Sequence, residues 1–208
     1  STWSVGAVTH ANHLAGEGLA GIAGQILSVA PPRFALVGFS FGGYLSFEIL
    51  RQARDRVAKL ALIDTSARAD TPESIENRRR RIELARAGKF GLVLQQSFPN
   101  SVHPDNAEDS ELMAIHRTMG ETNGAEAYVR HQEAIIARPD SRSMLAGIDV
   151  PTVIIVGEAD AITPPEVARE MHDGIADSRL AVIPNAGHMA LLERPAAVNA
   201  ALKEWALR

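Results

Sequence analysis

The stretch "LVGFSFGGYLSFEIL", residues 36–50, decides how this chain folds. Four apolar residues at positions 34–37 run into Gly38 and predict a buried strand. A helical pattern follows from Gly43, and its apolar face carries Leu45, Ile49 and Leu50. Ser40 stands alone in the turn between strand and helix, flanked by two bulky Phe residues. A small hydroxyl at so abrupt a turn is typical of an exposed nucleophile.

The same alternation of apolar strand and amphipathic helix recurs along much of the chain. Strands are predicted at residues 3–8, 34–38, 57–64, 152–156 and 179–183, and helices at residues 14–29, 43–54, 165–175 and 195–207. Unbroken apolar strands separated by helices predict a parallel sheet that is covered on both faces. The expected fold class is therefore α/β, with a mostly parallel, doubly wound sheet.

Residues 66–145 interrupt this alternation, because they read as several helices joined by polar loops. We predict a helical insertion that lies over the sheet. The chain then divides into three parts: residues 1–65, 66–145 and 146–208. The first and the last of these parts form the core.

The turn around Ser40 predicts a strained nucleophile whose hydroxyl is pushed clear of the sheet. Gly38 and Gly42, two residues before and two after it, are expected to crowd each other, so that both must be small. The N–H groups that begin the following helix favour developing negative charge. The backbone N–H of Phe41 is then the expected oxyanion donor. The alternative interpretation is a glycine-rich turn with an incidental serine.

A nucleophilic serine needs a base, and the chain has seven histidines. His188 differs from the others because its loop follows the last predicted strand, at the same sheet edge as Ser40. In open α/β sheets, sites form at that edge. The other six have structural explanations in helices or polar loops: His10, His13, His103, His116, His131 and His172.

The acid that orients the base is expected after another strand at this edge. Asp160 lies four residues beyond the strand at residues 152–156 and is the preferred candidate. Glu158 lies closer to the same strand, and Asp64 ends the strand at residues 57–64. Asp64 is the more serious alternative, although a capping or turn carboxylate at a strand end explains it better.

Four segments of the chain together resemble the α/β-hydrolase superfamily: "LVGFSFGGYLSFE", "LALIDTSA", "PTVIIVGEADAITPP" and "VIPNAGHMALLERP". The resemblance implies Ser40 as nucleophile, Asp160 as acid and His188 as base, in the family's chain order. It also implies that residues 66–145 are a cap domain that shapes the acyl or alcohol pocket. The last hundred residues are similar to the 3-oxoadipate enol-lactonase and small carboxylesterase branch.

One departure from the family pattern concerns the segment before the serine. The family carries a second oxyanion donor on a loop usually marked by His-Gly, and no such motif precedes Ser40. The family's third strand also has no counterpart here. Losing one oxyanion donor costs about 3–4 kcal/mol, whereas losing a buried central strand would exceed a total stability of about 5–15 kcal/mol. We therefore expect the natural chain to carry an upstream segment.

Composition narrows the possible functions. The net charge of −4 gives no electrostatic footprint for nucleic acid or an anionic membrane, and no apolar run approaches the length of a membrane span. The chain has no cysteine, which excludes thiolate metal sites and fits a reducing, cytoplasmic location. No metal-ligand cluster or phosphate-cradling loop is recognisable, so we expect no metal and no cofactor.

The sequence predicts a serine hydrolase that cleaves a small carboxylic ester or lactone through an acyl-enzyme. Alternatives are a C–C bond hydrolase or perhydrolase with the same triad, or a catalytically weak binding or regulatory module. The expected partner is a small molecule, and the oligomeric state stays open.

Three further features have structural interpretations. The arginine run at residues 78–81 is interpreted as a solvated helix face, and Glu193 as part of the start of the last helix. Met189 could line the pocket or fill the core.

Overall fold

The computed structural model describes residues 7–14 and 16–208. Its sheet has four parallel strands, in the order β1 (Phe34–Phe39), β2 (Val57–Ile63), β3 (Thr152–Gly157) and β4 (Ser178–Ile183). The predicted α/β class with a parallel sheet is confirmed. The strand predicted at residues 3–8 begins outside the described residues, and Ala7 and Val8 belong to no regular element.

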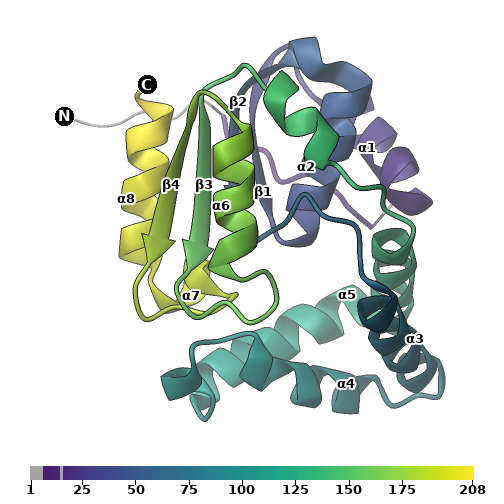
Figure 1. The fold of residues 1–208 in the computed structure, drawn as a ribbon. Helices are drawn as coiled ribbons and strands as arrows, with labels where there is room; N and C mark the ends of the chain where they lie inside the picture. The colour runs from purple at the N-terminus through teal and green to yellow at the C-terminus, as the bar shows by residue number, and fades with distance from the viewer. Residues whose placement is uncertain (1–6, 15) are drawn as a thin grey trace.

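Helices connect or follow the strands, and some of them pack on the faces of the sheet (Figure 1). They are α1 (Gly18–Val29), α2 (Phe41–Ala53), α3 (Pro72–Arg86), α4 (Phe90–Ser97), α5 (Ser110–Ile136), α6 (Pro165–Gly174), α7 (Ala190–Glu193) and α8 (Pro195–Ala206). The first helix begins later than predicted, because the backbone at Gly16 is left-handed, with φ at 100°. No helix within the described residues is long and apolar enough to cross a membrane.

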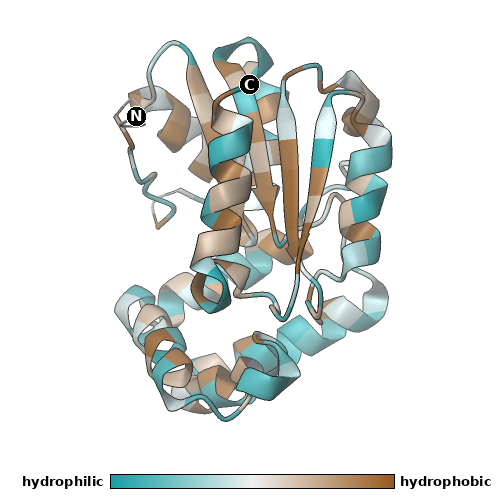
Figure 2. Cartoon of the chain, turned by 90° about the vertical axis from the view of Figure 1, so that its left-hand side faces the viewer, coloured by the Kyte–Doolittle hydropathy of each residue, from teal (hydrophilic) through white to brown (hydrophobic). Residues whose placement is uncertain are grey.

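The core lies on both faces of the sheet. Alternation along β2 sends Leu60 and Leu62 to one face and Ala61 and Ile63 to the other. On the first face they pack against buried residues of α2 and α6, namely Phe47, Leu50, Ala168 and Met171. On the second face they pack against Val198 and Trp205 of α8. Figure 2 shows largely apolar strands flanked by helices that also carry hydrophilic residues.

Residues 66–145, called the helical segment below, contain α3, α4 and α5. Figure 1 shows this segment beyond the carboxyl ends of the strands, on the same side as α7. The long helix α5 is interrupted at Gly124, where φ is 82° and ψ is 162°. This is a conformation that glycine adopts at low cost and that ends regular helical geometry. The helical segment therefore covers the edge of the sheet at which the predicted site residues lie.

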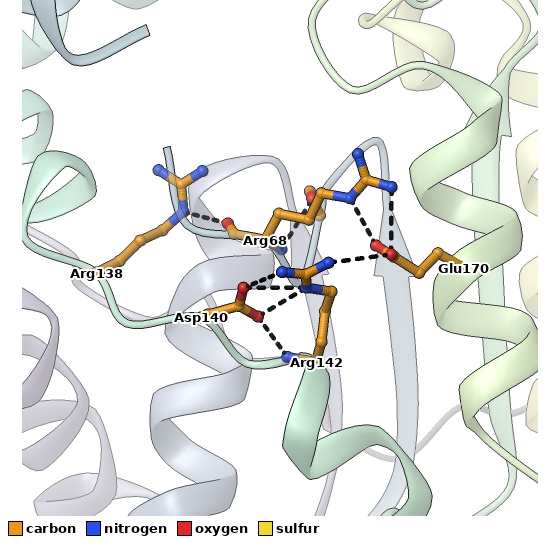
Figure 3. Close-up of polar contacts among 6 residues, drawn as sticks. Arg68, Arg138, Asp140, Arg142 and Glu170 are labelled. Carbon is orange, nitrogen blue, oxygen red and sulfur yellow. Dashed lines mark hydrogen bonds and ion pairs between the residues drawn. The ribbon is translucent and has the colours of Figure 1, made fainter. Parts of the chain in front are cut away.

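The two ends of the helical segment are bonded to each other and to the core. Ser141 N–H donates to the Ala67 carbonyl oxygen at 2.7 Å, and Arg68 pairs with Glu170 of α6 at 2.8 Å. Figure 3 shows the surrounding polar network, which includes Arg68, Arg138, Asp140, Arg142 and Glu170. These contacts fix where the segment leaves the core and where it returns.

The arginine run in α3 is only partly a solvated face. The side chains at positions 79–81 are exposed, and Arg80 pairs with Glu76 at 3.4 Å. Arg78 instead lies against Asp70, with 2.6 Å between Nε and Oδ2, and the Asp70 side chain is only 5% exposed. The interpretation of Arg78 as solvated was therefore wrong. It supplies a counter-charge to a buried carboxylate.

Candidate active site

Ser40 occupies the turn between β1 and α2 in a left-handed conformation, with φ at 49° and ψ at −111°. Such a backbone costs about 1–3 kcal/mol and needs support from its surroundings. Ser40 N–H donates to the Ile63 carbonyl oxygen at 2.9 Å, and Thr65 Oγ1 donates to the Ser40 carbonyl oxygen at 2.9 Å. The Ser40 hydroxyl makes no capping bond to α2, so it can face outward from the turn.

The glycines around Ser40 differ in how much room each has for a side chain. A Cβ at Gly38 would lie 2.4 Å from both the Gly42 carbonyl oxygen and Ser46 Oγ. A Cβ at Gly42 would meet nothing within 4 Å. The prediction that both must be small is therefore right for Gly38 and wrong for Gly42, because Gly42 crowds Gly38 with its backbone. Gly43, for which the sequence analysis made no prediction, has no room for a side chain, since its Cβ would lie 2.3 Å from Thr65 Oγ1.

We expect Gly38→Ala to lower the free energy of unfolding by about 1–3 kcal/mol, since the added methyl overpacks a rigid turn. Gly42→Ala is the matched control and should be neutral or slightly stabilising, because alanine favours the helix that contains it. Urea denaturation of both variants measures the difference. Equal destabilisation of the two variants would contradict the crowding at Gly38.

His188 lies between Ser40 and Asp160. Its Nε2 is 2.8 Å from Ser40 Oγ, and its Nδ1 is 2.8 Å from Asp160 Oδ2. The carboxylate accepts, so Nδ1 carries the proton and Nε2 is left to accept from the serine hydroxyl. His188 is 6% exposed and Asp160 is 2% exposed, so the bond between them is shielded from water, whereas the bond to Ser40 is partly buried. The arrangement can transfer a proton from Ser40 to the imidazole ring.

Asp160 is held as an anion by several donors. Its Oδ1 accepts from the N–H groups of Ile162 at 2.8 Å and Thr163 at 2.9 Å, and its Oδ2 accepts from Thr163 Oγ1 at 2.7 Å. Burial acts to raise the pKa of Asp160, but the hydrogen bond and charge of His188 and the bonds from Thr163 outweigh it and lower this pKa. Asp160 is therefore ionised at neutral pH and can stabilise an imidazolium.

The two alternative acids lie elsewhere. Asp64 is fully buried, and its Oδ1 accepts from Gly157 N–H at 2.8 Å, while its Oδ2 has no hydrogen-bond partner among the described residues. Glu158 is exposed and accepts from Asn185 N–H at 3.2 Å. Of the three carboxylates considered, Asp160 is the one within hydrogen-bond distance of His188.

Asp64 should make stability depend on pH. Burial raises the pKa of Asp64 to about 8, whereas an unfolded carboxyl ionises near pH 4. Between these values the folded state binds more protons, so its stability falls as pH rises, by about 5 kcal/mol at most, and levels off above pH 8. Urea denaturation between about pH 5 and pH 9 should show Asp64→Asn gaining stability relative to wild type. A difference that does not vary with pH would contradict this assignment.

Phe41 is the first residue of α2, so its N–H has no partner within the helix and can serve an oxyanion. Its ring stacks on His131 of α5, with 4.4 Å between ring centroids. Burial lowers the pKa of His131, and its Nε2 lies 3.0 Å from the His13 carbonyl oxygen. No local sequence pattern predicts this contact, because His131 and Phe41 belong to elements far apart along the chain.

The remaining histidines have other surroundings. His116 lies against Phe98 of the helical segment, and His172 Nδ1 lies 2.7 Å from Ser178 Oγ at the opposite end of β4. Within residues 7–14 and 16–208, no three His, Asp or Glu side chains gather into a group that could hold a metal ion.

Sequence reasoning also misjudged Glu193. It ends α7 rather than beginning the last helix, which starts at Pro195. Its side chain is buried and accepts hydrogen bonds from three N–H donors. The sequence pattern that could have indicated a buried role is a single carboxylate directly after two leucines in "LLERP".

Residues 3–201 match the Alpha/beta hydrolase family. The chain belongs to this family and is an enzyme of the hydrolase class. Among solved structures it is similar to a thermophilic esterase from Thermogutta terrifontis, with a TM-score of 0.84 and 33% identity over 92% of this chain and 72% of that one.

Two curated relatives are similar in sequence. The chain is 29% identical to the pimeloyl-[acyl-carrier protein] methyl ester esterase of Nitrosospira multiformis, over 82% of this chain and 67% of that protein. It is 26% identical to the "Putative non-heme bromoperoxidase BpoC" of Mycobacterium tuberculosis, over 87% of this chain and 70% of that protein. Both relatives are longer than the part of them that the chain covers.

Proposed function

We propose that the chain is a serine hydrolase that cleaves a small carboxylic ester or lactone through an acyl-enzyme. The observation that carries this proposal is the continuous hydrogen-bonded path from Ser40 through His188 to Asp160, with both bonds at 2.8 Å. Membership of the α/β-hydrolase family and similarity to proteins named as esterases support it.

The proposed reaction has two halves. His188 Nε2 takes the proton of Ser40 as Oγ attacks the carbonyl carbon, and the Phe41 N–H stabilises the oxyanion. His188 then gives the proton to the departing alcohol oxygen, which leaves an ester on Ser40. A water molecule, deprotonated by His188, releases the acid and restores the serine hydroxyl. Asp160 holds the imidazole in the required tautomer and stabilises its cationic form.

We further propose that the helical segment is the cap that shapes the pocket for the acyl or alcohol group. A cavity of about 440 Å³ lies between α4 and α5, lined by residues that include Leu94, Phe98 and Met113. Its volume falls in the range of small-molecule pockets. Phe98 also packs in a buried cluster with Met189, the neighbour of His188. The same lining also includes Gln95, His116 and Arg117, so the cavity would receive an apolar group beside polar side chains.

A fluorophosphonate probe and a panel of small esters and lactones test the proposal on the whole chain. We expect stoichiometric labelling of Ser40 and turnover of at least one panel substrate. A folded chain that is neither labelled nor active would overturn the proposal and favour a binding or regulatory module.

Perhydrolysis is a second candidate, favoured by the similarity to the bromoperoxidase-named relative. Hydrogen peroxide would replace water in attacking the acyl-enzyme, and the product would be a peracid. Incubation with an acetate ester and hydrogen peroxide, followed by assay of peracid, separates this activity from simple hydrolysis.

A further inference from the structure

The carboxylate of Glu193 bonds to two other segments of the chain. Its Oε2 accepts from Gly187 N–H at 2.7 Å, directly before His188. Its Oε1 accepts from His103 N–H at 2.7 Å and from Asn106 Nδ2 at 2.8 Å, both in the helical segment. Glu193 is only 7% exposed; its bond to Gly187 is buried, and its bonds to His103 and Asn106 are partly buried. Glu193 thus connects the loop of His188 to the helical segment.

A second contact connects the other side of His188 to the same part of the helical segment. Met189 N–H donates to the Ser101 carbonyl oxygen at 2.9 Å. The approach between Gly187 and the helical segment is also close, since a Cβ at Gly187 would lie 2.3 Å from the Val102 carbonyl carbon. Residues 187 and 189, on either side of the imidazole, are therefore both bonded, directly or through Glu193, to residues 101–106.

We infer that Glu193 is a positioning residue for His188, and that residues 101–106 act through it to hold the base at hydrogen-bond distance from Ser40. The inference rests on the proposed function. Glu193 touches neither Ser40 nor the imidazole in the described contacts, so its effect is indirect. Displacement of residues 101–106 would move both neighbours of His188 and lengthen the 2.8 Å bond to Ser40.

The chemistry of the three donors requires a carboxylate. An ionised carboxylate only accepts hydrogen bonds and has capacity for several donors. A glutamine has one accepting oxygen and one donating NH₂ group. If the glutamine oxygen faced His103 and Asn106, the glutamine NH₂ group would face the Gly187 N–H, and two donors would meet. In the reverse orientation the donors of His103 and Asn106 would have no acceptor. Glu193→Gln therefore preserves size while breaking one side of the connection.

Steady-state kinetics on an active panel substrate test the inference. Glu193→Gln should lower kcat by up to about 100-fold, because small misplacement of a catalytic group has effects of this size. KM should change little, because the base takes part in proton transfer rather than in substrate binding. The NMR resonance of the His188 Nδ1 proton should shift or broaden, which reports altered imidazole placement directly.

Two further variants keep the test decisive. Ser178→Ala removes a hydroxyl that bonds to His172 at the distant start of β4, and it controls for a general loss of stability. Its kcat should match wild type. Asn106→Ala leaves Glu193 and Gly187 bonded, and should lower kcat by a smaller factor, between about twofold and thirtyfold. This variant carries the test if Glu193→Gln does not fold, and an unchanged kcat would then overturn the inference.

The outcomes separate this inference from the proposed function. A wild-type chain without labelling or turnover would defeat the proposed function first. An active wild type, with a folded Glu193→Gln variant whose kcat loss does not exceed that of Ser178→Ala, would overturn the positioning role alone. A rise in KM alone, with unchanged kcat and an unchanged His188 proton resonance, would also overturn the positioning role. Glu193 would then be a structural residue of the pocket.

Discussion

Ser40→Ala should lower kcat by about a million-fold on any substrate that the wild type hydrolyses. The methyl group cannot attack a carbonyl, and the 2.8 Å hydrogen bond to His188 is lost. The fold should survive, because the Ser40 backbone keeps its hydrogen bonds to the Ile63 carbonyl oxygen and to the Thr65 hydroxyl, which the substitution does not remove. Loss of the hydroxyl bond alone costs about 1 kcal/mol.

The measurement compares initial rates and fluorophosphonate labelling of Ser40→Ala and wild type at equal folded concentration. Ser46→Ala is the matched control, because Ser46 is a buried serine of α2, the helix that follows Ser40, and its hydroxyl bonds to the Gly42 carbonyl oxygen at 2.8 Å. It should lose some stability and remain both active and labelled. Near-full activity of Ser40→Ala would exclude the proposed mechanism.

Asp160→Asn should lower kcat by about ten-thousand-fold with little change in the fold. The amide NH₂ group can donate to His188 Nδ1, which would move the ring proton to Nε2. In that tautomer Nε2 cannot accept the proton of Ser40. The two backbone bonds from Ile162 and Thr163 can still reach the amide oxygen, so the loop should keep its shape.

Asp64→Asn is the control that decides between the two carboxylates. Asp64 bonds to Gly157 and has no described contact with His188, so this variant should keep most of the wild-type kcat. The kcat of the two variants, measured on one substrate at one pH, provides the comparison. If Asp64→Asn lost as much activity as Asp160→Asn, both carboxylates would be needed for the reaction.

The sequence by itself determined the α/β class and the parallel sheet, because apolar strands and amphipathic helices leave local periodic patterns. It also selected Ser40, Asp160 and His188 as candidates, because each follows a strand at the edge where the carboxyl ends of parallel strands meet. Their catalytic role stays a prediction until the variants are measured.

Only the tertiary structure decided which carboxylate faces the imidazole. Asp64 and Asp160 both follow strands at the same edge, and the path of each loop, which the local sequence does not encode, sets the partner of each. The same holds for the open space at Gly42, the stacking of His131 on Phe41 and the three donors on Glu193. Each depends on atoms brought together from segments far apart along the chain, and periodicity carries no information about such contacts.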